Sequence, residues 1–210
     1  MWPEFHHHYH HHHLIPESPL KLRPTQMSVG LAEVVAKRRE WTRLDKKQRR
    51  KRLQRQVFPA VLGPDKRCYI LDHHHLGLAL IEEGVRKVWV SLQDDLSWLS
   101  VPVFWRTMEF RAWAHPFDEN GRRRDYSDIP ARLTQLQDDP YRTLANRVQE
   151  AGGFAKSVLP FAEFLWADFL RTRIGLAAAR RGSPLALRTG VRLARSSAAR
   201  YLPGWSGRGP

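Results

Sequence analysis

Three consecutive histidines follow an aspartate in the segment LDHHHLG, residues 71–77, and this DHHH box is the clearest chemical signal in the chain. Outside the N-terminal tract the only other histidine is His115. Imidazole can act as a general acid or base near neutral pH, as a neutral metal ligand, or, when protonated, as a donor to phosphate. Consecutive residues at a helix start point in different directions, so the box does not favour a zinc site made by the protein alone.

The DHHH box lies where an apolar strand pattern gives way to a helical one. The first N–H groups of a helix have no internal partners and receive anions. We therefore expect Asp72, His74 and His75 to be catalytic and His73 to contact phosphate, with Asp72 orienting a histidine or helping to hold a divalent ion. The alternative is that the three histidines only cap a helix.

The segment HPFDENGRRR offers a second set of reactive groups. His115 could supply another acid or base, Arg122 a clamp on phosphate, and Asp118 a second carboxylate for a metal held with Asp72. An ordinary polar turn around ENG is the alternative. In AGGFAK, Lys156 follows a glycine pair and is a further candidate phosphate contact, although a helix cap also explains the glycines.

Charge points to anionic partners. The 210 residues carry a formal net charge of +14, and the sequence pI is about 10.7, so nucleic acid or nucleotides would be attracted. The single cysteine, Cys68, excludes an internal disulfide and fits a reducing compartment. With no membrane-spanning apolar run and no secretory signal pattern, we expect a cytoplasmic protein of undetermined oligomeric state.

Periodicity predicts the elements that position these groups. Residues 1–21, rich in histidine, are expected to be a disordered extension. A helix is expected after Pro24, with Val29, Ala32, Val35 and Ala36 on one face and Thr25 or Ser28 as cap. It continues into an exposed basic arm from Lys37 to Arg55, which carries eleven lysines and arginines against two acids. The arm is either a phosphate-contacting stripe or a solvated helix face.

The compact part follows the order strand, strand, helix, strand. The runs VFPAVLG and RCYILD form an expected hairpin across PDK, then HHHLGLALIEEG reads as a helix closed by Gly84, and KVWVSL returns to strand. Several helices are expected beyond residue 100, including one in PARLTQLQ. The tail 175–210 has no acid; it is either a basic amphipathic helix for nucleic acid or membrane, or it packs back through Leu185, Val191 and Leu193.

The stretch CYILDHHHLGLALIEEGVRKVWVSL resembles the signature of the ParB/sulfiredoxin superfamily: a strand ending in aspartate, a polar box, an apolar helix and another strand. The blocks LRPTQMSVGLAEV, FPAVLG, HPFDENGRR, DDPYRTLA, AGGFAK and PFAEFLWADFLR are similar to a bacterial group of ParB-like nucleases. The resemblance implies an α+β domain over residues 22–174, with a small mixed sheet in 22–100, packed helices in 101–174, and a helical C-terminal extension.

The resemblance also implies site residues. Arg23, Thr25 and Gln26 match the superfamily's first box, which lies across from the DHHH box and helps bind phosphate or nucleotide. His74 stands where sulfiredoxins carry their catalytic cysteine, so sulfiredoxin chemistry is excluded. Leu76 stands where relatives have an arginine that binds phosphate. The resemblance therefore does not identify the side chain that would bind phosphate in its place.

Three functions remain open at this point. The first is a nuclease that hydrolyses phosphodiesters at the DHHH box with the help of Mg²⁺ or Mn²⁺. The second is a nucleotide-dependent phosphotransferase acting on a small hydroxyl compound, as in the free-serine-kinase branch that the superfamily includes. The third is a non-catalytic DNA-binding or partition module, motivated by the basic arm and the acid-free tail.

Overall fold

The computed structural model describes residues 14–207 and contains a four-stranded mixed sheet in the order β1-β5-β3-β4. The strands are β1 Leu14–Glu17, β3 Val57–Gly63, β4 Arg67–Ile70 and β5 Val88–Asp95. Strands β3 and β5 are parallel, and the other two pairs are antiparallel. The predicted disorder of residues 1–21 is wrong for 14–21, because β1 pairs with β5 and Pro19–Lys21 form a 3-10 turn; the histidine tract up to residue 13 lies outside the described residues.

The sheet and its crossover helix form as the sequence predicts. Strands β3 and β4 make a hairpin across Pro64–Lys66, and α3 (His74–Glu82) carries the chain from β4 to β5. The apolar face of α3 is buried in a core that it shares with β3, β5 and α1. Because β3 and β5 are parallel, the connection between them needs such a crossover, and the DHHH box falls at its first turn.

The first predicted helix starts later than expected. Ser28–Val29 form β2, which pairs in parallel with β6 (Gln137–Asp138), and α1 spans Leu31–Thr42 with Gly30 as its N-cap. The predicted caps and apolar face are therefore wrong: Val34 and Trp41 are buried and Val35 is exposed. Helix α2 (Lys46–Arg55) begins with a capping box between Asp45 and Gln48.

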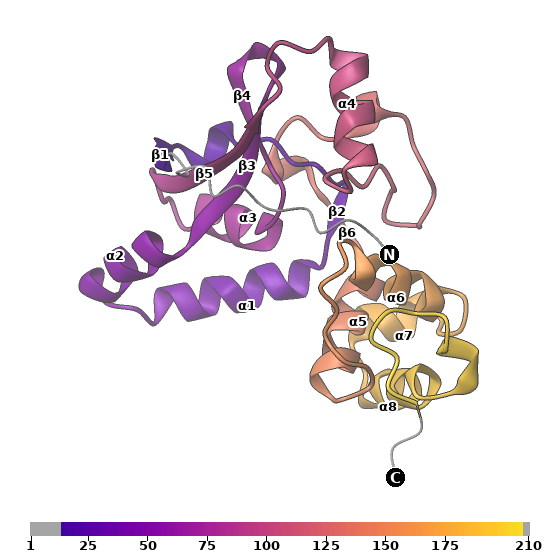
Figure 1. Cartoon of the computed structure of the whole chain (residues 1–210). Helices are drawn as coiled ribbons and strands as arrows, with labels where there is room; N and C mark the ends of the chain where they lie inside the picture. Colours follow the sequence, from indigo (N-terminus) through magenta and orange to yellow (C-terminus); the bar gives the residue numbers. More distant parts are fainter. Residues whose placement is uncertain (1–13, 208–210) are drawn as a thin grey trace.

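The helices beyond the sheet form two groups (Figure 1). Helix α4 (Val101–Phe110) packs near the hairpin, whereas α5 (Pro140–Glu150) and α6 (Ala162–Arg171) build a second lobe with its own core. The helix expected in PARLTQLQ is not present; Leu133–Gln135 form a 3-10 turn and β6 follows. Pairing of this segment with β2 overrides its weak helical pattern.

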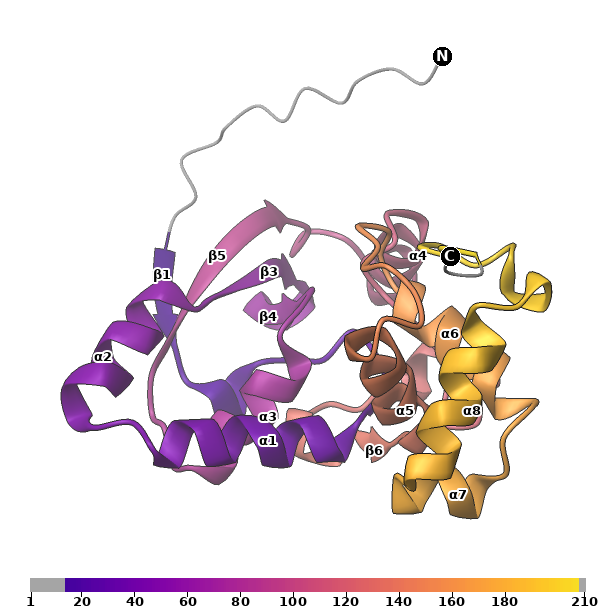
Figure 2. The same cartoon turned by 90° about the horizontal axis from the view of Figure 1, so that it is seen from below.

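The tail completes the second lobe. Helices α7 (Leu176–Arg181) and α8 (Pro184–Ala194) lie beside α5 and α6 in both ribbon views (Figures 1 and 2). Ala186, Gly190 and Ala194 are buried in the contact, while Leu185 stays 65% exposed, contrary to its predicted packing role. Among the described residues, no helix is long and apolar enough to cross a membrane.

Candidate functional site

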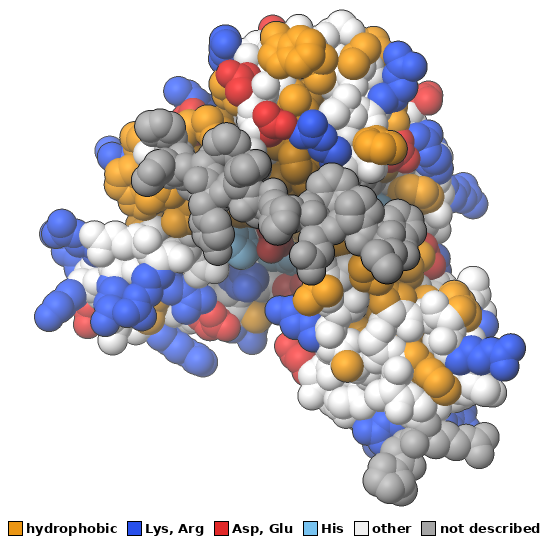
Figure 3. All heavy atoms as spheres, in the orientation of Figure 1, with side chains coloured by type: hydrophobic (Ala, Val, Ile, Leu, Met, Phe, Trp, Pro, Cys, Tyr) orange, Lys and Arg blue, Asp and Glu red, His pale blue; other side chains and the backbone are white. Residues whose placement is uncertain are grey.

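A cleft of about 630 Å³ separates α1 and the DHHH box from the lobe of α5 and α6. First-turn residues of four helices line it: Glu33 of α1, His75 of α3, Arg142 and Thr143 of α5, and Glu163 of α6. Helix amino ends carry partial positive charge, so their convergence favours an anion. In the space-filling view a histidine lies with acidic and basic side chains in the hollow between α1 and the lobe (Figure 3).

The box turns sharply at His73 before α3 begins. His73 is the N-cap residue in the left-handed region, with φ 67°, and no side chain caps the helix. Its own N–H donates to Asp72 Oδ1 at 2.5 Å, and its ring packs edge-on against Phe58. Asp72 and His73 both line the cleft. The amino end of α3 therefore presents backbone donors at the cleft without a competing cap.

His74 points away from the cleft into the protein. Its side chain is buried, and its Nε2 accepts the backbone N–H of Thr25 at 3.2 Å. Burial, together with nearby positive charge, lowers the pKa of His74 to about 3, so the ring is neutral at physiological pH. Thr25 Oγ1 donates to the Ile70 carbonyl oxygen at 2.8 Å. His74 thus ties the two predicted boxes together from beneath, where Thr25 and Gln26 are also buried.

His75 faces the cleft and is paired with a carboxylate. Its Nε2 lies 2.8 Å from Glu33 Oε2 and 3.2 Å from the Gly30 amide nitrogen. One nitrogen cannot donate to the carboxylate and accept from the amide at once. The Gly30 contact meets hydrogen-bond geometry, whereas the Glu33 contact is within ion-pair range; we assign the proton to Nε2, facing Glu33, because the contact with the carboxylate is the shorter.

Arg142 is a buried arginine that lines the cleft. Its side chain is 5% exposed, yet its Nε and Nη1 have no hydrogen-bond partner. Nη1 lies 3.2 Å from Glu163 Oε1, within ion-pair range, but the approach does not meet hydrogen-bond geometry. The guanidinium rests 3.9 Å from the centroid of the Phe164 ring. Burial lowers the pKa of Arg142 to about 10, which leaves it charged at neutral pH.

A buried, charged guanidinium without hydrogen bonds is costly unless a ligand supplies them. Two further side-chain atoms beside it, Thr143 Oγ1 and Glu33 Oε1, are also buried without a partner. Arg142 and Thr143 both line the cleft, so an oxyanion there would be attracted by a buried positive charge. Because Nε, Nη1 and the Thr143 hydroxyl are buried, hydrogen bonds from these atoms to an oxyanion require the side chains to turn toward the cleft.

His115 lies behind this site in a cage of aromatic rings. Its ring centroid is 4.0 Å from that of Phe164, and Phe117 and Phe161 stack on it as well. Burial, together with the charge of Arg142, lowers the pKa of His115 to about 3. His115 does not line the cleft; its backbone N–H donates to the Thr25 carbonyl oxygen at 2.8 Å. The geometry gives His115 a packing role.

The remaining predicted residues divide between the cleft and other surfaces. Lys156 lines the cleft. Arg23 lies at a different surface, where its guanidinium donates to the Ala131 carbonyl oxygen. Asp118 Oδ1 accepts the N–H groups of Asn120 and Arg122, each at 2.9 Å, so these residues close their own loop outside the cleft.

The predicted metal pair is not assembled. Asp72 lines the cleft, whereas Asp118 does not, and its Oδ1 already accepts two backbone N–H groups of its own loop. Within residues 14–207 no group of three or more His, Cys, Asp or Glu side chains is arranged to hold a metal ion. The carboxylates present do not fit the Mg²⁺ or Mn²⁺ site that the sequence suggested.

Sequence reasoning missed Glu33, Arg142, Thr143 and Glu163. A signal for Arg142 exists in DDPYRTLANRV, because the proline marks a helix start and the arginine falls among side chains that the helix buries: Tyr141, Leu144, Ala145 and Val148. A charge on a buried face needs a partner or a ligand. Glu33 lies in the first turn of α1, which the misplaced helix start concealed.

The chain matches one protein family and is similar to a solved structure. Residues 19–172 match the family described as "Putative ParB-like nuclease". The structure is similar to the crystal structure of protein Atu1540 from Agrobacterium tumefaciens, with 43% sequence identity and a TM-score of 0.86. That similarity covers 94% of this chain and 100% of the other. No curated protein matches the chain.

Proposed function

The chain belongs to the ParB-like nuclease family, and on this premise we propose that it binds a nucleic-acid phosphate in the cleft and cleaves the phosphodiester bond there. Family membership and the α+β fold confirm the resemblance read from the sequence. The observation that carries the proposal is Arg142, a buried cation in the cleft whose Nε and Nη1 have no hydrogen-bond partner. A phosphate would supply the acceptors that this guanidinium lacks.

Arg142 supplies the positive charge that relatives have from an arginine at the position of Leu76. Leu76 lies in the core beneath the sheet and is 6% exposed, so it contributes no charge to the cleft. The guanidinium comes instead from α5, where it meets the uncapped amino end of α3 across the cleft. In this proposal Arg142 and the first backbone N–H groups of α3 bind the non-bridging phosphate oxygens, and Lys156 adds positive charge at the rim.

His75 is the proposed general base. With Nε2 donating to Glu33, Nδ1 is left to take a proton from water, whose oxygen then bonds to phosphorus. The bond from phosphorus to the leaving oxygen breaks, and that oxygen takes its proton from Lys156 or from solvent. Glu33 is a positioning residue that fixes the tautomer of the ring and stabilises the imidazolium as it forms. No step of this proposal passes through a metal ion.

Cleavage assays test the proposal directly. Purified protein is incubated with single-stranded and plasmid DNA, with EDTA or with added Mg²⁺ or Mn²⁺. We expect cleavage by the wild-type protein and a loss of about a hundredfold or more for His75→Asn. A matched control is His73→Asn, in the same box but not paired with Glu33. Equal cleavage by wild type and His75→Asn would reject His75 as the base.

A second function is favoured by the size of the cleft. A volume of about 630 Å³ suits a single bound nucleotide, and this favours the alternative of a nucleotide-dependent phosphotransferase. That alternative predicts nucleotide turnover stimulated by a small hydroxyl compound such as free serine, with no DNA cleavage. Tight DNA binding with no turnover of either kind would instead select the non-catalytic module.

A further inference from the structure

The basic arm leads out of the cleft. Here "the arm" means Lys37–Arg55, which comprises the second half of α1, the turn after it and α2. We propose, resting on the proposed function of the cleft, that the arm binds the backbone of a single-stranded nucleic acid while one phosphate of that strand enters the cleft. The inference adds a partner surface and a substrate class to the site.

Most lysines and arginines of the arm form no ion pair with another described residue. Of its eleven lysines and arginines, only Arg38 and Arg52 form ion pairs among the described residues. Arg49 packs over the Trp41 ring and donates to the Trp41 carbonyl oxygen, so it is occupied as well. The other eight remain for phosphate: Lys37, Arg39, Arg43, Lys46, Lys47, Arg50, Lys51 and Arg55. Helix α2 buries none of its residues.

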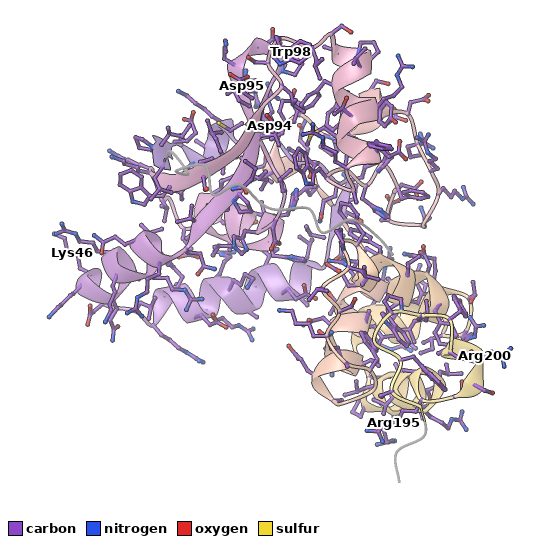
Figure 4. The ribbon with its side chains drawn as sticks, in the orientation of Figure 1. Lys46, Asp94, Asp95, Trp98, Arg195 and Arg200 are labelled. Carbon is purple, nitrogen blue, oxygen red and sulfur yellow. The ribbon has the colours of Figure 1, made fainter. Side chains whose placement is uncertain are left out.

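The arm and the cleft form one continuous surface. Glu33, Ala36, Lys37 and Glu40 lie at helical spacing on α1 and all line the cleft. Of the two acids in this stripe, Glu40 pairs with Arg52 at 3.3 Å, whereas Glu33 lies against the neutral ring of His75 and keeps its negative charge. Lysine and arginine side chains gather along α1 and over α2, and Lys46 projects from the far end (Figures 3 and 4). A bound strand would meet far more basic than acidic side chains along the arm, while the acids lie mainly in the cleft: Glu33, Asp72, Glu150 and Glu163.

Access to Arg142 favours a single strand. Its guanidinium is buried at the base of the cleft, so a phosphate must leave the surface of a regular duplex to reach it. Single strands bend freely, whereas extruding a nucleotide from a duplex costs a few kcal/mol of unpairing and unstacking. A basic groove that follows the backbone is the usual electrostatic basis for binding single strands without sequence preference.

A second basic surface provides a matched control. Exposed arginines lie on the helical lobe and the segment after α8. Within the described residues no side-chain hydrogen bond or ion pair is made by Arg180, Arg188, Arg192 or Arg200. Figure 4 shows Arg200 on the lobe, on the opposite side of the molecule from Lys46. Replacing four residues on either surface removes the same formal charge, so only the position of the charge differs.

Binding of oligothymidylates to the full chain tests the inference. The arm variant carries Lys46→Ala, Lys47→Ala, Arg50→Ala and Lys51→Ala; the control carries alanine at Arg180, Arg188, Arg192 and Arg200. For a strand of about twelve nucleotides we expect the arm variant to bind at least about tenfold more weakly than the control, with a salt slope smaller by about 2 to 3. A strand of about two nucleotides, which fills only the cleft, should bind all three proteins alike.

The outcomes separate this inference from the proposed function. Equal affinity of the arm and control variants for the long strand would overturn the inference, as would equal wild-type affinity for duplex and single strand. Arm-dependent binding to anionic phospholipid vesicles without arm-dependent binding to the oligomer would overturn it too. If the wild-type protein cleaves nothing but its length-dependent binding needs the arm, the nuclease proposal fails and the inference stands.

Discussion

The ring nitrogen Nε2 of His75 lies 2.8 Å from Oε2 of Glu33, and the two side chains are 16% and 21% exposed. One comes from the first turn of α3 and the other from the first turn of α1, so the pair exists only when the two helices pack together. Of the three histidines in the DHHH box, His75 has the shortest contact with a carboxylate, since His73 Nδ1 lies 3.7 Å from Asp72 Oδ2.

The first prediction concerns Glu33. Glu33→Gln keeps the shape of the side chain but removes the charge that supports the His75 imidazolium, so the cleavage rate should fall while strand binding stays near that of wild type. Cleavage rates and strand affinities of the two proteins, measured under the same conditions, check this. Glu40→Gln, on the same cleft-lining stripe of α1, should leave the rate unchanged; an equal loss there would contradict the specific role of Glu33.

The second prediction is a pH dependence of folding. His74 and His115 have pKa values near 3 in the folded protein because both are buried, against about 6.5 when unfolded. Since the unfolded chain binds more protons, stability is complete above about pH 6.5 and falls as the pH drops, by up to about 1.4 kcal/mol per unit for each histidine.

Urea unfolding between about pH 7.5 and pH 5 measures this slope. His115→Phe preserves the aromatic stack with Phe164 and removes one titrating group, so its slope should be clearly smaller than that of wild type. An unchanged slope would show that His115 is not buried as a neutral ring.

The third prediction concerns the support beneath Arg142. Asp139 is fully buried; its Oδ1 accepts the Tyr141 N–H at the start of α5, and its Oδ2 lies 2.8 Å from Arg171 Nη2. Asp139→Asn removes the buried partner of Arg171 and leaves this arginine paired only with the more exposed Asp168, so it should lower the free energy of unfolding by about 2 to 3 kcal/mol.

Chemical denaturation measures the effect of Asp139→Asn. The double variant Asp139→Asn with Arg171→Met should lose less than the sum of the two single variants, because no charge is stranded. Strict additivity would contradict the pairing.

The sequence predicts the hairpin, α3, β5 and the position of the DHHH box, because each rests on a local pattern and its bounding turns. It misses β2 and β6, which are two residues long and exist only through their pairing across more than one hundred residues. The same tertiary pairing moves the start of α1 to Leu31 and brings Glu33 to the cleft. Arg142 was missed for a related reason: DDPYRTLANRV places it among the buried side chains of a helix, but the cleft that it lines forms only when α5 packs near α1 and α6.

The DHHH box shows what residue type and spacing leave undetermined. Residue type and spacing identify three candidate imidazoles but not the direction of each ring. The left-handed turn at His73 and the helix that follows send His74 inward to Thr25 and His75 outward to the cleft. Asp118 and Arg122 are polar, like the residues that line the cleft, but the Arg122 N–H donates to Asp118 Oδ1 within their own loop.

The fourth prediction concerns Leu76, which stands where relatives have arginine. Its side chain is in the core with 6% exposure, so Leu76→Arg would bury a charge without a partner and should destabilise the protein by several kcal/mol. Leu76→Met, a swap of similar volume, should cost less than about 1.5 kcal/mol. Thermal unfolding compares the two; a stable Leu76→Arg protein with stronger phosphate binding would show that this position, and not Arg142, grips the ligand.

The central claim is that Arg142 is held in the cleft to bind phosphate. Isothermal titration of a nucleoside bisphosphate into wild type, Arg142→Lys and Arg142→Met measures this directly, with urea unfolding of each protein beside it. We predict that Arg142→Met loses about tenfold to a hundredfold or more in affinity, since charge-assisted hydrogen bonds disappear, while its stability is unchanged or raised because a buried charge without hydrogen bonds is gone and only the half-exposed Glu163 loses an ion-pair contact. Arg142→Lys should lie between. An Arg142→Met protein that is folded and binds the bisphosphate as tightly as wild type would contradict the account.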